Sequence, residues 1–291
     1  TTKNELDLPP VDLRIRRVEL PALHREIYDS LVGEVSDRWR GSEDEASALG
    51  RVMLYLIMAA TTPALLATGT TPHEPLPYQL DPLRTEPGSD LETLLRDLPH
   101  YEMSPKYAEV LATVAANAAA GRKTLIWSTF VRNLTSLHRM LKAFDPAMVH
   151  GGTPDRAEEL RKFREDSTCM VLLSNPATLG EGVSLHQVCN DAIYVDRDFA
   201  AGRFLQSLDR IHRLGLAPDA KTNITVLVAS NTIDELVEQR LALKLEFLGA
   251  VLDDPAVRQL ADLQEEPTAS AGMDAADLHA MAEYLSVSSG T

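Results

Sequence analysis

The sequence predicts an α/β fold in which helices cover both faces of a parallel sheet, with a mainly helical region in front of it. After Gly121, short runs of β-forming residues alternate with amphipathic helical stretches, and this alternation is typical of βαβ units. The first 120 residues show helical spacing and loops but no sheet pattern, so we expect no strand there. At 291 residues the chain can bury a large core, as one large domain or two smaller ones.

The helical region is predicted to contain separate helices joined by an irregular connector. Apolar residues recur at helical spacing after Pro21, and residues 52–60 form a second, more apolar helical segment. Seven prolines between residues 63 and 99 interrupt regular structure and predict the connector. Ser104–Pro105 predicts the start of a new helix, because Ser is a favoured N-cap and Pro a favoured first helical residue.

The α/β region contains five predicted strands, at residues 124–129, 147–150, 170–174, 192–196 and 223–229. Predicted helices lie between them at residues 132–144, 154–164 and 202–213. A capping box at Thr232–Glu235 begins a last helix that ends near Gly249. We therefore divide the chain into a helical linker and accessory insert (1–120), the sheet domain (121–265) and an acidic flexible tail with one short helix (266–291).

The composition excludes several classes of protein. Lys and Arg number 28 and Asp and Glu 43, so the formal charge is −15, and such a surface does not suit a general nucleic-acid coat protein. A local basic groove inside an acidic surface stays compatible with nucleic-acid binding. The two cysteines, Cys169 and Cys189, are too few for a disulfide framework or a four-cysteine zinc site.

The chain shows no membrane or export segment. The longest apolar run, Val52–Ala60, has nine residues, whereas a spanning helix needs roughly 20. The first residues lack the charged and apolar stretches of a signal peptide. With the low cysteine content, this predicts a cytoplasmic protein without membrane contact. Because the sequence begins in a polar stretch without Met, we expect it to be a piece of a longer protein.

Three strand ends carry unusual polar sequences, and ligands of parallel sheets collect at the carboxyl ends of strands. These segments are Lys123–Phe130, Leu173–Leu185 and Gln206–Gly215. In the third, Arg210 and Arg213 stand three residues apart, so both guanidinium groups leave the same helix face. Paired arginines suit a phosphate chain because each presents a planar fork of donors. From spacing alone, surface ion pairs are the alternative.

Taken in order, these segments resemble the second RecA-like lobe of superfamily-two helicases, above all the Swi/Snf-type DNA translocases. Lys123–Phe130 is similar to motif IV, and His150–Thr153 to the Gly-Ser/Thr motif that follows it. Leu173–Leu185 resembles motif V, and Gln206–Arg213 has the Q-x-x-x-R-x-x-R form of motif VI. Tyr194–Phe199 resembles the strand before motif VI. Any one motif is weak evidence, whereas four in order at the family's spacing make a strong signal.

The resemblance is close over residues 121–250 and weak over 1–120, and it implies a RecA-like sheet domain. It implies that Arg210 and Arg213 act as arginine fingers on ATP bound mainly to the opposite lobe. Gln206 is implied to orient motif VI against the nucleotide or that lobe. The residues implied to pass close to the ribose, and to couple nucleotide state to DNA, are Gly180, Glu181 and Gly182.

The resemblance also implies contacts with one strand of duplex DNA. Hydroxyls and amides bind the phosphate backbone without reading base sequence. The residues implied to do so are Thr129, Thr153, Ser174 and Asn175. Two features depart from the family pattern: Asn175–Pro176 and Glu181 stand where Swi/Snf members usually carry Thr-Arg and an apolar residue, and Leu216 where Gln is common.

The sequence lacks the G-x-x-x-x-G-K-[ST] phosphate loop that the first lobe of the family supplies. The nearest string, Gly121–Thr124, precedes a strand instead of following one. The resemblance therefore implies that ATP, with its Mg²⁺, binds mainly to a first lobe outside this chain, and that the chain alone does not hydrolyse ATP. The expected partners are duplex DNA, the first RecA-like lobe of the same protein and other subunits of a larger complex.

Other interpretations stay open from the sequence. A non-catalytic helicase-like module that binds a protein or nucleic acid fits the same motifs, and the lobe of an RNA helicase fits motif VI equally well. Trp127 lies in an apolar strand and is expected in the core, with base stacking as the alternative. His186 and His212 are expected to be packing or surface residues, and we predict no metal site.

Overall fold

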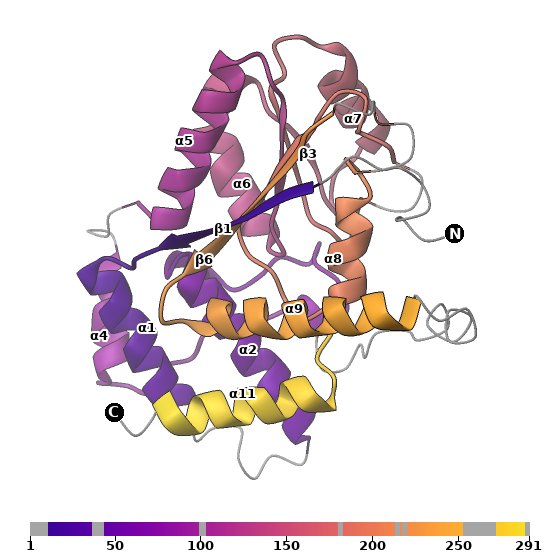
Figure 1. Cartoon of the computed structure of the whole chain (residues 1–291). Coiled ribbons are helices and arrows are strands. Elements are labelled where there is room, and N and C mark those ends of the chain that lie inside the picture. Colours follow the sequence, from indigo (N-terminus) through magenta and orange to yellow (C-terminus); the bar gives the residue numbers. More distant parts are fainter. Residues whose placement is uncertain are drawn as a thin grey trace.

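The computed structural model describes residues 11–36, 44–98, 103–179, 183–212, 216, 220–252 and 272–288. Its centre is an all-parallel sheet with strand order β1-β6-β5-β2-β4-β3 (Figure 1). The strands are β1 (Val11–Val18), β2 (Thr124–Trp127), β3 (Ala147–Val149), β4 (Val171–Ser174), β5 (Asp191–Tyr194) and β6 (Thr222–Ala229). The predicted α/β class with a RecA-like parallel sheet is confirmed.

Helices cover both faces of the sheet because side chains alternate along each buried strand. On β2, Ile126 packs toward α5 (Pro105–Ala119) and α6 (Val131–Met140). Leu125 and Trp127 pack toward the other face, which α7 (Arg156–Glu165) and α8 (Ala201–Leu208) cover. Trp127 is fully buried and stacks against Tyr194 with ring centroids 6.3 Å apart. Trp127 is therefore a core residue and is not placed to stack on a base.

The first 120 residues contribute a strand, so the prediction of no strand there is wrong. β1 pairs with β6 in parallel along its whole length, from Val11 opposite Thr222 to Val18 opposite Ala229. It lies at the edge of the sheet, and its exposed side chains include three arginines and Leu13. The apolar residues at Val11, Leu13 and Ile15 alternate with polar ones, which is the period of a half-buried strand.

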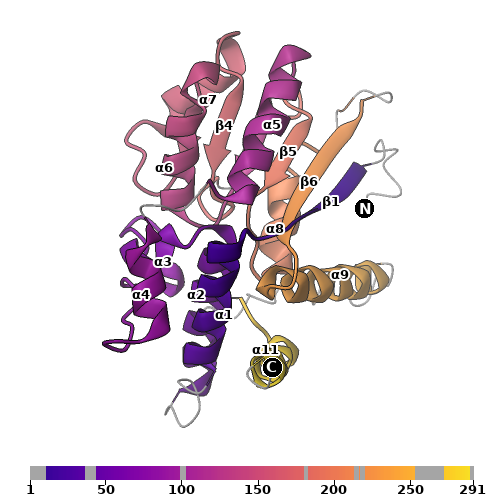
Figure 2. The same cartoon turned by 90° about the vertical axis from the view of Figure 1, so that its left-hand side faces the viewer.

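A layer of helices packs beyond the carboxyl ends of β1 and β6 (Figures 1 and 2). Its helices are α1 (Ala22–Val35), α2 (Glu45–Thr61), α3 (Ala64–Thr68), α4 (Asp90–Arg96), α9 (Ile233–Leu252) and α11 (Ala275–Ser288). α2 is buried on most sides, as its almost uninterrupted apolar sequence requires. α11 is fixed to α9 because Asp277, which is fully buried, pairs with Arg240 and Lys244. The domain boundaries at residues 120 and 265 stay predictions.

His24 of α1 is a buried histidine that the fold keeps neutral. Its Nε2 lies 2.5 Å from the Ala59 carbonyl oxygen, and burial lowers the pKa of His24 from 6.5 to about 4. Because the folded-state pKa is depressed, the unfolded chain takes up a proton as the pH falls from 6.5 to 4, while the folded chain does not. We expect this group to remove roughly 3 kcal/mol of stability over that window.

The variant His24→Gln tests this expectation, since its amide can still donate to Ala59. The free energy of unfolding, measured by denaturant titration at pH 7 and at pH 4.5, should fall less in His24→Gln than in the unmodified chain. His279→Gln, at an exposed site, is the control and should keep the original pH dependence. Identical pH dependence in all three proteins would show that His24 does not contribute.

Candidate functional site

The candidate site lies where three neighbouring strands end. Thr129 follows β2, Asn175 follows β4 and Asp196 follows β5, and all three line one hollow at the carboxyl edge of the sheet. This is the edge at which parallel sheets place ligands, because the loops after the strands converge there. The structure thus brings together two of the predicted DNA-contacting residues, Thr129 and Asn175.

The predicted motif VI lies on α8 and the turn that follows it. Ala201, Phe204 and Ser207 recur at helical spacing and bury one face of α8, which leaves Gln206 exposed. Arg210, just beyond the helix, is 7% exposed. The Arg210 side chain is therefore buried within the lobe and does not project into solvent.

Arg210 joins motif VI to the end of motif V. Its Nη1 donates to the carbonyl oxygen of Val183 at 3.4 Å, and its own carbonyl oxygen accepts from the backbone N–H of Leu185 at 2.8 Å. Two segments that are 25 residues apart in the chain are therefore in direct contact. The other predicted nucleotide-site residues, Gly180, Glu181, Gly182 and Arg213, lie outside the described residues.

Two predicted DNA-contacting hydroxyls are engaged inside the lobe. Ser174 is fully buried and its Oγ donates to the carbonyl oxygen of Val149, on the neighbouring strand, at 2.7 Å. The Oγ1 of Thr153 accepts from the N–H of His150 at 2.9 Å and donates to Met148 at 3.2 Å. This geometry favours a structural role for Ser174, while Thr153, which is half-buried, fixes the turn after β3.

A connector strap, residues 70–80, crosses the same edge of the sheet. Glu74 accepts from the N–H of Val131, the first residue of α6, at 2.9 Å. A Cβ on Gly151 would lie 2.2 Å from the carbonyl oxygen of His73, and one on Gly152 2.6 Å from the His73 ring. The two glycines after β3 therefore serve close packing against the strap.

Asp196 is a buried charged group at this edge, 3% exposed. It accepts hydrogen bonds from Ser128 Oγ at 2.5 Å, from the N–H of Thr129 at 2.7 Å and from Asn133 Nδ2 at 3.0 Å. Burial raises the pKa of Asp196, an effect that these donors and the nearby charge of Lys106 oppose. The hydrogen bonds of the Asp196 carboxylate thus connect the end of β5 to the start of α6.

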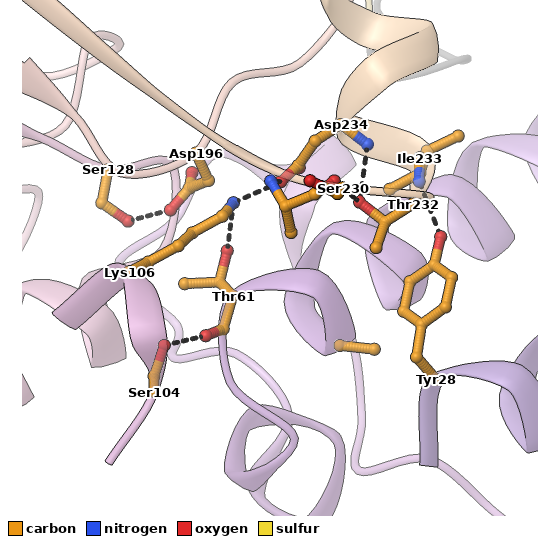
Figure 3. A network of polar contacts seen from close by, with 12 residues as sticks. Tyr28, Thr61, Ser104, Lys106, Ser128, Asp196, Ser230, Thr232, Ile233 and Asp234 are labelled. Atoms are coloured by element: carbon orange, nitrogen blue, oxygen red, sulfur yellow. Dashed lines mark hydrogen bonds and ion pairs between the residues drawn. The ribbon is translucent and has the colours of Figure 1, made fainter. Parts of the chain in front are cut away.

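Beside Asp196, a buried ion pair fixes the helical layer to the sheet (Figure 3). Lys106 is fully buried, and its Nζ lies 2.6 Å from Asp234 Oδ2 and 3.3 Å from Thr61 Oγ1. Asp234 also accepts from the N–H of Ala229 at 2.8 Å, and Ser104 Oγ donates to the carbonyl oxygen of Thr61 at 2.5 Å. The starts of α5 and α9 and the end of α2 therefore meet at one polar cluster.

Several residues of this edge have no role that the sequence predicts. Asp196, Arg197 and Asp198 were treated only as part of a strand before motif VI, and Lys106 and Tyr78 received no role. A signal for the first three was available, because a charged triplet directly after a buried strand lies at the ligand edge of a parallel sheet. Nothing in the sequence indicates that Lys106 pairs with Asp234, which lies 128 residues away.

Among the described residues, no group of three or more His, Cys, Asp or Glu side chains is placed to hold a metal ion. No helix in that part of the chain combines the length and the apolar character that crossing a bilayer requires.

Part of the chain is similar to a known protein family. Residues 105–215 match the model of the helicase conserved C-terminal domain. The ATP-dependent helicase FUN30 of Saccharomyces cerevisiae is 31% identical over 137 residues, which are 45% of this chain and 12% of the yeast protein. The chain therefore corresponds to a small part of that relative's length.

Two solved structures share the fold. The C-terminal part of the Fun30 ATPase domain superposes with a TM-score of 0.58 at 19% identity, covering 96% of this chain and 97% of that one. The Sulfolobus solfataricus SWI2/SNF2 ATPase core in complex with dsDNA gives 0.56 at 16% identity, covering 87% of this chain and 48% of that one. These matches show that residues 105–215 are similar to the helicase conserved C-terminal domain and that the chain shares the fold of the C-terminal part of the Fun30 ATPase domain.

Proposed function

We propose that this domain is the second ATPase lobe of an ATP-dependent DNA translocase and that it works with a first RecA-like lobe of the same protein. ATP and its Mg²⁺ bind mainly to the first lobe, because this chain contains no phosphate loop. Arg210 and Arg213 then reach the phosphates from the second lobe, where Gln206 orients them. The segment expected to pass close to the ribose is Gly180, Glu181 and Gly182.

The contact between Arg210 and residues 183–185 is the observation that supports this proposal most. Residues 183–185 directly follow the 180–182 segment in the sequence, so the hydrogen bond from Leu185 joins the end of motif V to Arg210. The single 3.4 Å hydrogen bond from Arg210 to Val183 is long, and hydrogen bonds to a phosphate are shorter and stronger. A phosphate presented by the first lobe would therefore draw the guanidinium away from Val183 and toward the transferring group.

The DNA contact is proposed for the carboxyl edge of the sheet. Thr129 and Asn175 line its hollow, so a phosphate backbone passing over this edge meets a hydroxyl and an amide donor, while Thr153, whose hydroxyl donates to Met148, shapes the turn after β3 beside it. Ser174 stabilises the same edge because its hydroxyl donates to the Val149 carbonyl oxygen on the neighbouring strand. A structural relative was solved in complex with dsDNA, which favours duplex DNA over RNA as the partner. We expect the complete protein to act in the cytoplasm, with further subunits of a larger complex as partners.

The experiment that tests this function measures duplex binding and phosphate release by the isolated chain. Binding should be weak and indifferent to base sequence, because few phosphate-directed donors lie on an acidic body of charge −15. Affinity should fall steeply with salt as counterions cease to be released. No ATP hydrolysis should occur without a first lobe. Tight binding that persists at high salt, binding of single-stranded RNA alone, or phosphate release by the purified chain would each contradict the proposal.

A further inference from the structure

A small hollow lies at the start of α8, between the ends of β2, β4 and β5. Its volume of about 30 Å³ is room for about two water molecules or for two oxygen atoms of a larger group. Ala177, on its rim, is exposed, so the hollow is reached from the surface. The positive end of the α8 dipole faces it, because Ala200, Arg203 and Phe204 all line the hollow.

Asn175 presents an unpaired amide to this hollow. The residue is 1% exposed, and neither Oδ1 nor Nδ2 has a hydrogen-bond partner among the described residues. An unpaired buried polar group costs about 1–3 kcal/mol, so few proteins keep one without a use. Because Asn175 lines the hollow, its Nδ2 is a donor available to a group bound there.

Arg197 presents an unpaired cation to the same hollow. Its guanidinium packs over the ring of Phe204, 5.3 Å from the centroid, and the described residues include no hydrogen-bond or ion-pair partner for it. Burial lowers the pKa of Arg197, and the carboxylates of Asp198, Asp234 and Glu238 oppose this from longer range. A guanidinium is never left uncharged in a protein, so it keeps five donors available.

The two carboxylates that line the hollow are already occupied. Asp196 holds three internal donors, as described above. Asp198 Oδ2 accepts from Tyr78 OH at 2.7 Å and lies 3.8 Å from Arg203 Nη1, and its Oδ1 accepts from the N–H of Ala200 at 2.9 Å. The free hydrogen-bonding capacity of the hollow therefore consists chiefly of donors, which selects an anion.

We propose that this hollow binds one phosphate group, with the Arg197 guanidinium as the main donor and Asn175 Nδ2 as the second. The planar fork of an arginine matches two phosphate oxygens, which is what the volume admits, and the rest of the ligand lies outside. The group is a phosphodiester of a DNA strand or a free phosphate. The DNA source rests on the proposed function, whereas the phosphate site itself does not.

The test compares Arg197→Gln with Arg96→Gln in the isolated chain. Arg96 is a matched control: it removes the same charge from α4, where its side chain is 72% exposed and 3.8 Å from Glu92. The affinity for a short duplex is measured by fluorescence anisotropy from low to moderate salt. Arg197→Gln should weaken binding roughly tenfold or more and reduce the slope against log salt by about one, because one phosphate contact is lost. Arg96→Gln should change neither.

A second arm uses inorganic phosphate alone, followed by line broadening of its phosphorus NMR signal. The unmodified chain should broaden the signal and Arg197→Gln should not. Asn175→Asp should abolish broadening, because it places a carboxylate in the hollow, and Arg197→Lys should restore only part of it. Thermal melts establish that each variant is folded.

The two measurements distinguish a DNA phosphodiester from free phosphate as the ligand, and they test the phosphate site separately from the proposed DNA function. Phosphate binding without duplex binding would refute the DNA function and support a site for free phosphate. Duplex binding that competes with inorganic phosphate in the unmodified chain but not in Arg197→Gln would assign the site to the DNA backbone. Equal losses in Arg197→Gln and Arg96→Gln, or phosphate broadening that survives Arg197→Gln, would overturn the site.

Discussion

In the two-lobed protein proposed above, Arg210→Ala should reduce the rate of ATP turnover on the order of 10³-fold while leaving DNA binding and the fold almost unchanged. An arginine finger acts on charge that develops in the transition state, so its loss lowers kcat more than it raises KM for ATP. The size follows from arginine fingers of other phosphoryl-transfer enzymes. Arg210→Lys should not restore turnover, because a point charge cannot reproduce the planar fork of donors.

Arg164 offers a matched control for Arg210. Its Nη2 donates to the carbonyl oxygen of Ser184 at 3.3 Å, so it contacts the same stretch of backbone in the same way, but from α7. If Arg210 only holds residues 183–185 in place, then Arg164→Ala and Arg210→Ala should have similar, small effects on turnover and on the melting temperature. Near-normal turnover in Arg210→Ala would show that motif VI has been wrongly assigned.

Much of the fold could be predicted because the buried strands of a parallel sheet have a clear sequence pattern. The runs around Leu125, Leu172 and Ile193 are continuous and apolar, since both of their faces are covered by helices. β1 was missed because Arg16 and Arg17, both exposed, break the alternation of apolar and polar residues after Ile15, which leaves only a short pattern. An edge strand is specified mostly by its partner, β6, and a partner more than 200 residues away is not visible locally.

The candidate site was predictable only where its residues are local in sequence. Arg210 and Gln206 share one turn of chain, and Asn175 follows its strand directly, so a pattern of neighbours identifies them. Arg197 follows β5 directly, yet its importance depends on having no hydrogen-bond or ion-pair partner among the described residues, which only the folded arrangement around Phe204 reveals. Contacts across the strap, such as Tyr78 with Asp198, join segments 120 residues apart.

The ion pair between Lys106 and Asp234 raises the question of what the helical layer contributes to this lobe. Both side chains are almost completely removed from water, and together they connect α5 to the start of α9, at the end of β6. A buried pair of this kind gains little over apolar residues of the same shape, because desolvation offsets the attraction. Its retention beside Asp196 is therefore better explained by orientation: the pair fixes the angle at which the helical layer meets the carboxyl edge.

Removing one partner should be far more damaging than removing both. Lys106→Met leaves the Asp234 carboxylate buried without its cation, and we expect the free energy of unfolding to fall by about 3–5 kcal/mol. Asp234→Asn should cost a similar amount, because it leaves a buried ammonium, although its amide oxygen can still accept from Ala229. The double variant carries no buried charge at this point, so it should lose clearly less than the sum of the two single variants.

A surface pair on the same helix provides the comparison. Arg17 contacts Glu235 and Glu238 of α9 at 3.0 and 2.9 Å, with half of its side chain exposed, and Arg17→Met should cost less than about 1 kcal/mol. Urea titrations of the five proteins give the free energies, and equal slopes against urea concentration establish that the same surface unfolds in each. Additive losses in the double variant, or a cost for Lys106→Met as small as that for Arg17→Met, would mean that the two buried charges do not depend on each other. If the coupling is found, the carboxyl edge that carries Asn175, Arg197 and Arg210 is held in position by the helical layer, and the first 120 residues are part of the site's support.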